Sequence, residues 1–328
     1  MNLKNPITLP CGAVLKNRIA KSAMSENMSP KHHGPTKELI HAYERWAMGG
    51  AAMLVTGNVM IDRKALGEPG NVVVDDSRDF KLLEQWANAA KKHEVHIWPQ
   101  LNHPGRQAIG AINKEVVAPS AIMTKVKGMQ AMFKKPRALE EAEIYDLIDR
   151  FGNTAFIMKE AGFTGVQIHG AHGYLVSQFL SPLTNQRNDQ WGGTLENRAR
   201  FVVEVYKNIR AKVGVDFPVG IKINSADFQR GGFTNEESME VVKVLGSLGM
   251  DLIEVSGGTY EAPVMIGDNR KQSTKEREAY FLDYVKKVRK QIDTPLMLTG
   301  GFRTVEVMES ALKDGDLDII GLARPFTL

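Results

Sequence analysis

Two histidines and a tyrosine stand close together in the segment His169–Leu183, which reads HGAHGYLVSQFLSPL. Imidazole N–H groups can donate hydrogen bonds to one carbonyl oxygen, which polarises a conjugated C=C bond and stabilises the negative charge that builds on the oxygen. A phenol beside them can deliver a proton to carbon. His169, His172 and Tyr174 therefore predict a catalytic site that activates an oxygen-bearing substrate and protonates it.

The spacing of the two histidines has two other interpretations. An H-x-x-H pattern suits zinc, but no third or fourth ligand is evident in the neighbouring sequence. The pair could also be structural and cap the loop. Because Tyr174 suits acid chemistry better than metal binding, we favour the catalytic interpretation and expect no metal at His169 and His172.

Eight short apolar runs rich in β-branched residues must position these side chains, and a helical pattern follows each of the first seven. The runs are Arg18–Met24, Ala51–Val59, Val95–Leu101, Gly165–His169, Val219–Asn224, Leu252–Ser256, Leu296–Gly300 and Leu317–Leu322. The helical segments are Thr36–Met48, Arg78–His93, Leu139–Ala161, Leu195–Val213, Asn235–Leu248, Lys275–Gln291 and Thr304–Lys313. This alternation predicts an α/β fold, a closed (β/α)8 TIM barrel with the histidine pair at its C-terminal mouth. A doubly wound open sheet is the alternative, but no G-x-G-x-x-G pattern follows the first run.

Segments outside this repeat should decorate both ends of the barrel. Ile7–Leu15 predicts an N-terminal hairpin before the first strand, which could plug the barrel floor. Two long loops, Asn102–Ala138 after strand three and Gly257–Thr274 after strand six, follow strand C-termini and should lie on the catalytic face. They could act as lids, although Met123–Lys135 could equally be a disordered, inert insertion. The sequence ends at Leu328, directly after strand eight, where a complete barrel would add another helix.

Length and composition suit one such barrel. The chain has 328 residues, of which 43% are hydrophobic and 24% charged, so we expect one domain over residues 1–328. The net charge of +4 does not indicate nucleic-acid binding but is compatible with an anionic cofactor or reductant. The only cysteine, Cys11, excludes a disulfide framework and a Cys-rich metal or iron–sulfur site. No apolar stretch resembles a signal peptide or a membrane span, so we expect a soluble cytoplasmic protein.

The stretch from Gln167 to Phe201, which contains HGAHGYLVSQFLSPLTNQRNDQWGGTLENRARF, resembles the signature of the Old Yellow Enzyme family of FMN-dependent ene-reductases. NRIAKSAMS near the start, WPQLNHPGR on strand three, and GGFRT and IIGLARP near the end resemble further family motifs in the same order. The resemblance covers essentially the whole chain. It implies a (β/α)8 barrel with bound FMN, NADH or NADPH as reductant, and the single-domain branch without an iron–sulfur segment.

The resemblance implies the same roles for the histidine pair and the phenol, and it adds two flavin ligands. Gln100 matches the glutamine that hydrogen-bonds the flavin pyrimidine edge, since an amide offers both a donor and an acceptor. Lys222 matches a basic residue that faces the flavin N1/O2 edge and stabilises the anion of reduced flavin. A polar barrel-mouth residue without a ligand is the alternative for Gln100, and an internal salt bridge with Glu254 is the alternative for Lys222.

Backbone groups and small residues complete the implied flavin site. Ala23, Met24 and Ser25 at the end of strand one match residues against the isoalloxazine ring, and relatives carry Thr or Cys at the Ser25 position. Gly57 matches a small residue at the end of strand two that lets the backbone approach the flavin, with simple strand termination as the alternative. The phosphate is expected at the loops after strands seven and eight, on Gly300, Gly301, Phe302, Ala323 and Arg324.

Together these residues predict that NADH or NADPH reduces FMN, which then reduces a small electrophilic alkene, an α,β-unsaturated carbonyl or nitro compound. Asn27 stands where some relatives carry an aromatic residue that contacts substrate, so the pocket should differ there. A flavin-free barrel lyase or isomerase with His169 and His172 as metal ligands is one alternative, and a non-catalytic flavin-binding protein is another. No nucleic-acid or membrane partner is expected, and a homo-oligomer is compatible with the family.

Overall fold

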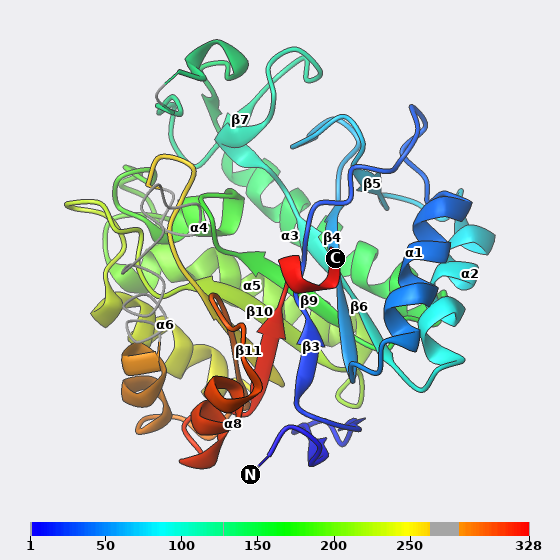
Figure 1. Cartoon of the computed structure of the whole chain (residues 1–328). Coiled ribbons are helices and arrows are strands. Elements are labelled where there is room, and N and C mark those ends of the chain that lie inside the picture. Colours follow the sequence, from blue (N-terminus) through cyan, green and yellow to red (C-terminus); the bar gives the residue numbers. More distant parts are fainter. Residues whose placement is uncertain (1, 127, 263–281, 328) are drawn as a thin grey trace.

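The computed structural model describes residues 2–126, 128–262 and 282–327. Its central feature is a parallel barrel whose strands are β3 (Ile19–Lys21), β4 (Met53–Met60), β6 (His96–Asn102), β9 (Val166–Gly170), β10 (Val219–Asn224), β11 (Leu252–Ser256), β12 (Leu296–Thr299) and β13 (Ile319–Leu322). The first strand, β3, pairs with β13 on one side and with β4 on the other, which closes the sheet (Figure 1). The predicted (β/α)8 barrel is confirmed, and two of its strands, β10 and β11, have the predicted bounds.

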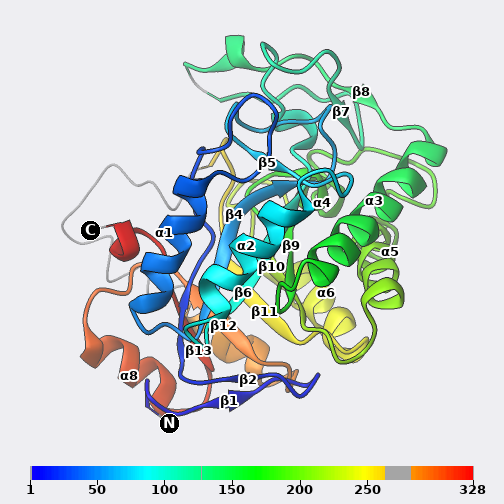
Figure 2. The same cartoon turned by 90° about the vertical axis from the view of Figure 1, so that its right-hand side faces the viewer.

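Helices surround the barrel (Figure 2). They are α1 (Lys37–Met48), α2 (Phe80–Lys91), α3 (Glu141–Glu160), α5 (Leu195–Val213), α6 (Asn235–Ser247), residues 282–289 and α8 (Val305–Lys313). The first part of the predicted helix Lys275–Gln291 lies outside the described residues. The short helix α4 (Leu175–Leu180), which directly follows Tyr174, was not predicted. Threonine side chains cap the start of α1, α5 and α6 by accepting a backbone N–H.

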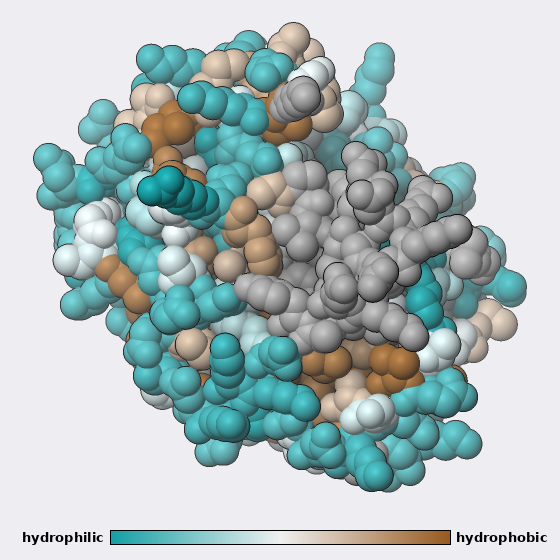
Figure 3. Space-filling model, turned by 60° about the vertical axis from the view of Figure 1, so that its left-hand side comes forward, coloured by the Kyte–Doolittle hydropathy of each residue, from teal (hydrophilic) through white to brown (hydrophobic). Residues whose placement is uncertain are grey.

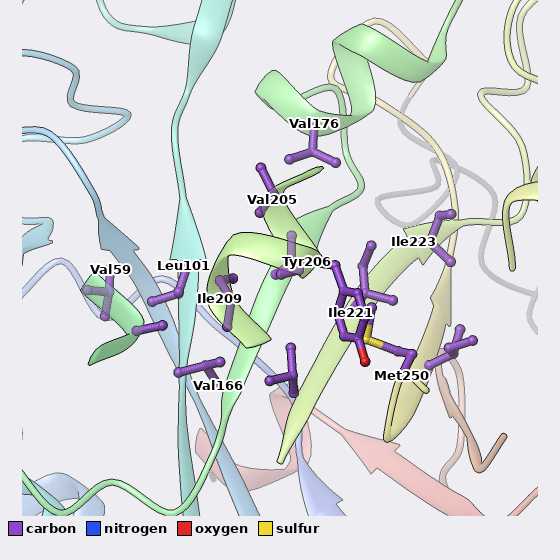
Figure 4. Packing of buried hydrophobic residues seen from close by; sticks show 14 of the residues in the cluster. Val59, Leu101, Val166, Val176, Val205, Tyr206, Ile209, Ile221, Ile223 and Met250 are labelled. Atoms are coloured by element: carbon purple, nitrogen blue, oxygen red, sulfur yellow. The ribbon is translucent and has the colours of Figure 1, made fainter. Parts of the chain in front are cut away.

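Apolar side chains on the outer face of the strands pack against the helices. Figure 4 shows Val166 on β9 and Ile221 on β10 among Val205 and Ile209 of α5. All four side chains are fully buried, and each contributes about 1.5–3 kcal/mol of favourable burial free energy. This layer fixes the position of β9 and β10, which carry several of the predicted site residues.

The floor of the barrel is closed by the predicted hairpin. Strands β1 (Ile7–Thr8) and β2 (Val14–Leu15) pair antiparallel, and Leu9 and Leu15 belong to one buried cluster with Trp98 from inside the barrel. Neighbouring strands leave room for the Trp98 ring because they carry glycine: a Cβ on Gly165 would lie 2.5 Å from its indole, and one on Gly220 would lie 3.0 Å away. The hairpin therefore plugs the floor, as predicted.

Long loops cover the opposite end (Figures 1 and 2). They contain the short elements β5 (Val72–Val73), η1 (Gly105–Gln107), β7 (Val117–Ala118), η2 (Gln130–Met132) and β8 (Arg137–Ala138), and η4 (Arg324–Thr327) follows the last strand. In the segment Met123–Lys135, Phe133 is buried and forms a β-bridge with Ile109. The described part of this segment is thus folded onto the protein.

The two long loops after strands three and six are joined to each other. Glu261 forms an ion pair with the buried Arg106, and its carboxylate also accepts the backbone N–H of Lys125 at 2.5 Å. The carboxylate of Glu261 therefore connects both loops on the catalytic face.

Hydrophilic residues dominate the face of the molecule shown in Figure 3, and hydrophobic residues form small separate groups on it. None of the helices in the described part of the chain is long and apolar enough to cross a membrane.

Candidate active site

Polar side chains fill the barrel interior next to its C-terminal mouth. The Nε2 of Gln100 donates to Oε1 of Gln167 at 2.7 Å, and the Nε2 of Gln167 donates to Oε2 of Glu254 at 2.7 Å. The Nζ of Lys222 lies 3.1 Å from Oε1 of Glu254, so the internal salt bridge considered for Lys222 is present. All four side chains are buried. We call Gln100, Gln167, Lys222 and Glu254 the interior polar layer.

Glu254 is the centre of this layer. The hydroxyl groups of Ser22 and Thr299 donate to its Oε1 at 3.1 and 2.6 Å, in addition to the contacts from Lys222 and Gln167. A fully buried carboxylate is costly unless it is paired and hydrogen-bonded, and these four partners meet that requirement. The layer therefore holds the Gln100 amide and the Lys222 ammonium in defined positions.

The structure brings the three predicted catalytic side chains together. The ring centroids of His169 and His172 are 5.2 Å apart, and the ring of Tyr174 lies 4.7 Å from that of His169. His172 adopts a left-handed backbone with φ of 61°, followed by Gly173 at 78°, so the chain turns sharply after β9. This turn returns His172 and Tyr174 to the side of His169.

Both imidazoles are neutral at pH 7. Burial lowers the pKa of His169 well below its usual value, and the neighbouring His172 and Lys222 lower it further. Burial and Lys222 lower the pKa of His172 to about 3. The Nδ1 of His169 accepts the backbone N–H of Ala171 at 3.3 Å, so its proton lies on Nε2. The Nε2 of His172 lies 2.8 Å from the hydroxyl of Ser256.

Tyr174 keeps its proton. Its side chain is buried, and burial raises the pKa of its hydroxyl well above the usual value, with a further rise caused by Tyr260. The two hydroxyl oxygens are 2.7 Å apart. Tyr260 was not predicted, although it lies in the loop after strand six that was expected on the catalytic face. Its position became evident only once the barrel had brought the ends of β9 and β11 together.

The end of strand one differs in detail from the prediction. Strand β3 ends at Lys21, and Ala23 packs against the floor cluster. The hydroxyl of Ser25 donates to the carboxylate of Glu68, a residue that the sequence did not indicate. Burial raises the pKa of Glu68.

Gly57 does not end strand two, so its predicted position is wrong, whereas its place beside the flavin stays a prediction. It lies inside β4, where the pairing with β6 shifts between Val55 and Asn58. A Cβ at Gly57 would clash with the carbonyl oxygen of Met24 and with the carboxylate of Glu26. The absence of a side chain therefore lets the segment Met24–Glu26 cross the strand closely, which is a packing requirement of this chain.

The predicted phosphate residues come from two adjacent strands. Gly300 and Gly301, with φ of 148° and 81°, follow β12, and Ala323 and Arg324 follow β13. Because β12 and β13 are paired, these loops start side by side. The Arg324 side chain is exposed, whereas Phe302 is buried in the main core. Glycine N–H groups and a guanidinium suit a phosphate.

The donor set at the mouth fits a flavin. Asn102, which ends β6, is 1% exposed, yet its Oδ1 and Nδ2 have no hydrogen-bond partner among the described residues. A polar ligand at the mouth would satisfy them. The amide of Gln100 and the ammonium of Lys222 suit the pyrimidine edge, and the loops after β12 and β13 suit the phosphate. The metal alternative would need further ligands beside His169 and His172, and the described part of the chain contains no group of three or more such side chains.

Comparisons with known proteins give the family. The model of the NADH:flavin oxidoreductase / NADH oxidase family matches residues 2–328. The NADH-dependent flavin oxidoreductase iliE of Hypocrea jecorina is 40% identical over 98% of this chain and 85% of its own length. The NADPH dehydrogenase of a Geobacillus species is 30% identical over 98% of this chain and 89% of its own.

A solved structure agrees with these sequence relatives. The old yellow enzyme homologue of Zymomonas mobilis superposes with a TM-score of 0.83 at 25% identity, over 99% of this chain and 89% of that one. The fold, the donor set at the mouth and the relatives all indicate the same family. The chain belongs to the NADH:flavin oxidoreductase / NADH oxidase family, that of the Old Yellow Enzyme, and is an FMN-binding oxidoreductase that uses NADH or NADPH.

Proposed function

We propose that this protein reduces the activated C=C bond of α,β-unsaturated carbonyl or nitro compounds, with residues 1–328 acting as one domain. The observation that carries the proposal is the group formed by His169, His172 and Tyr174, which lies beside the interior polar layer at the barrel mouth. Bound FMN supplies hydride transfer, first from NADH or NADPH and then to the alkene. The reductant and the alkene occupy the same site in turn.

The two histidines hold the substrate oxygen in this proposal. Neutral imidazoles each offer one N–H group without bringing a full charge into the buried site. For His169 this group is Nε2–H, because Nδ1 accepts the N–H of Ala171. Hydrogen bonds to the oxygen become stronger as negative charge builds on it, so they favour the transition state over the bound substrate.

Tyr174 gives the proton to the α-carbon. Its raised pKa keeps the hydroxyl protonated at neutral pH, and its position beside the ring of His169 places it next to the oxygen-binding groups. Gln100 and Lys222 would hold the flavin pyrimidine edge, and Glu254 would keep Lys222 in place beneath it. Gly300, Gly301, Phe302, Ala323 and Arg324 would hold the phosphate.

An anaerobic absorption experiment tests the proposal. The protein is loaded with FMN, reduced with NADH or NADPH, and then mixed with 2-cyclohexenone or a nitroalkene. We expect the flavin bands to bleach on reduction and to return when the alkene is added, with the saturated compound as product. Flavin that bleaches but is reoxidised only by oxygen or quinones would overturn the assignment to C=C bonds. A protein that stays colourless and loses activity with a chelator would favour the metal alternative.

A further inference from the structure

Tyr174 is buried, but its hydroxyl contacts that of a second tyrosine, which is partly exposed at the protein surface. Tyr174 is 6% exposed and Tyr260 is 39% exposed, and their hydroxyl oxygens are 2.7 Å apart. Their rings meet edge to face, with centroids 5.8 Å apart. Tyr260 therefore connects the buried hydroxyl of Tyr174 to a side chain that reaches the protein surface.

A proton donor in this position must be reprotonated in every cycle. Without a second proton source, Tyr174 would be left as a phenolate in a buried site after giving its proton to the α-carbon, and burial disfavours that charge. Its small exposed fraction gives water little access to the phenolate. The hydroxyl of Tyr260 is already at hydrogen-bond distance.

We propose that Tyr260 returns to Tyr174 the proton that the substrate takes. The inference rests on the proposed reduction of a C=C bond. The electron pair of the enolate forms the new C–H bond as the O–H bond of Tyr174 breaks. In the same step the O–H bond of Tyr260 breaks as its proton forms a new O–H bond with the oxygen of Tyr174, and solvent then restores the proton of Tyr260.

The segment that carries Tyr260 is held on both sides. Thr259 forms a β-bridge with His172, and its hydroxyl accepts the side-chain amide of Gln229 at 3.2 Å. Glu261, on the other side, is paired with the buried Arg106. Because both neighbours are anchored to the catalytic face, the position of the Tyr260 hydroxyl is a property of the fold.

The polarity of the contact suits transfer toward Tyr174. If Tyr260 donates to the oxygen of Tyr174, the proton of Tyr174 remains free to point at the substrate. Burial raises the pKa of both phenols, so both hydroxyls are protonated at neutral pH and Tyr260 has a proton to give.

The test compares Tyr260→Phe with the wild type in separate half-reactions of the FMN-loaded protein. Bleaching by NADH should keep its rate within about twofold, because that step needs no phenol proton. Reoxidation by 2-cyclohexenone should slow about 100-fold, the low end of the range for a lost proton-transfer partner. The reoxidation rate is also measured in mixtures of H2O and D2O. Its dependence on D2O content should be curved in the wild type and linear in Tyr260→Phe, because one proton instead of two then moves in the step. Tyr145→Phe on α3, whose ring is exposed, is the matched control and should change neither half-reaction.

A double variant separates the relay from a structural role. If Tyr260 acts through Tyr174, Tyr174→Phe/Tyr260→Phe should reoxidise no more slowly than Tyr174→Phe alone. Wild-type reoxidation and an unchanged D2O dependence in Tyr260→Phe would overturn the relay alone, as would additive losses in the double variant. A wild-type flavin that no alkene reoxidises would overturn the proposed function and the relay with it.

Discussion

The floor and the mouth of this barrel are built on the same strands, but apolar side chains fill the floor and polar side chains fill the mouth. Strand β6 contributes Trp98 to the floor cluster and Gln100 to the interior polar layer, and β11 contributes Leu252 and then Glu254. Residues two apart on a strand point to the same side, so one step along the barrel axis separates the two regions. The apolar residues pack against the hairpin, and the polar residues face the catalytic groups. The residues that stabilise the floor and those that support the site are therefore only two positions apart on each strand.

Trp98→Ala should destabilise the packing at the barrel floor. Gly165 and Gly220 lie against the indole and have no side chain that could fill the cavity from that side. We expect a loss of about 4–5 kcal/mol in the free energy of unfolding, measured by urea denaturation. Phe156→Ala on α3, where the ring is 45% exposed, is the control and should change stability by about 0.5 kcal/mol or less. A loss below about 1 kcal/mol in Trp98→Ala would mean that the hairpin does not depend on the indole.

Glu254→Gln should destabilise the interior polar layer next to the barrel mouth. The change leaves the buried Lys222 ammonium without its ionic partner, so we expect a loss of about 3 kcal/mol in stability together with weaker FMN retention. The double variant Glu254→Gln/Lys222→Met removes the unpaired charge and should recover at least about 1 kcal/mol, but not FMN binding. Unfolding curves and flavin content after gel filtration measure the two effects. Recovery of FMN binding in the double variant would contradict the proposed role of Lys222.

Much of the floor and part of the mouth follow from local sequence. Apolar runs predicted the eight strands, because burial on both faces demands such runs, and the segment Ile7–Leu15 predicted the hairpin. His169, His172 and Tyr174 were predictable because they lie within six residues of chain. Gln167 and Tyr260 were not assigned roles, and Glu254 was considered only as an alternative partner of Lys222, since their partners lie on other strands and meet only when the barrel closes. The position of Gly57 in its strand was predicted wrongly, because the sequence does not distinguish a glycine that ends a strand from one that lets another segment cross it closely.

The smallest expected effect is a pH dependence carried by His172. Its pKa is lowered to about 3 in the folded protein, so between pH 3 and 6.5 the unfolded chain binds a proton that the folded protein does not. The stability that this histidine contributes is complete above pH 6.5 and is lost as the pH falls toward 3. His172→Asn should therefore show a shallower loss of unfolding free energy between pH 6.5 and 5, and asparagine tolerates the left-handed backbone. An equal slope in both proteins would show that the ring titrates normally.

The carboxylate of Glu261 joins the loops after strands three and six, and the residue before it is Tyr260. A movement that separated these loops at Glu261 would also displace Tyr260, because the two residues are adjacent in the chain. Under the proposed relay, the return of a proton to Tyr174 would require the Glu261 contacts to be in place, so the reaction of a bulky alkene would depend on how fast those contacts form again.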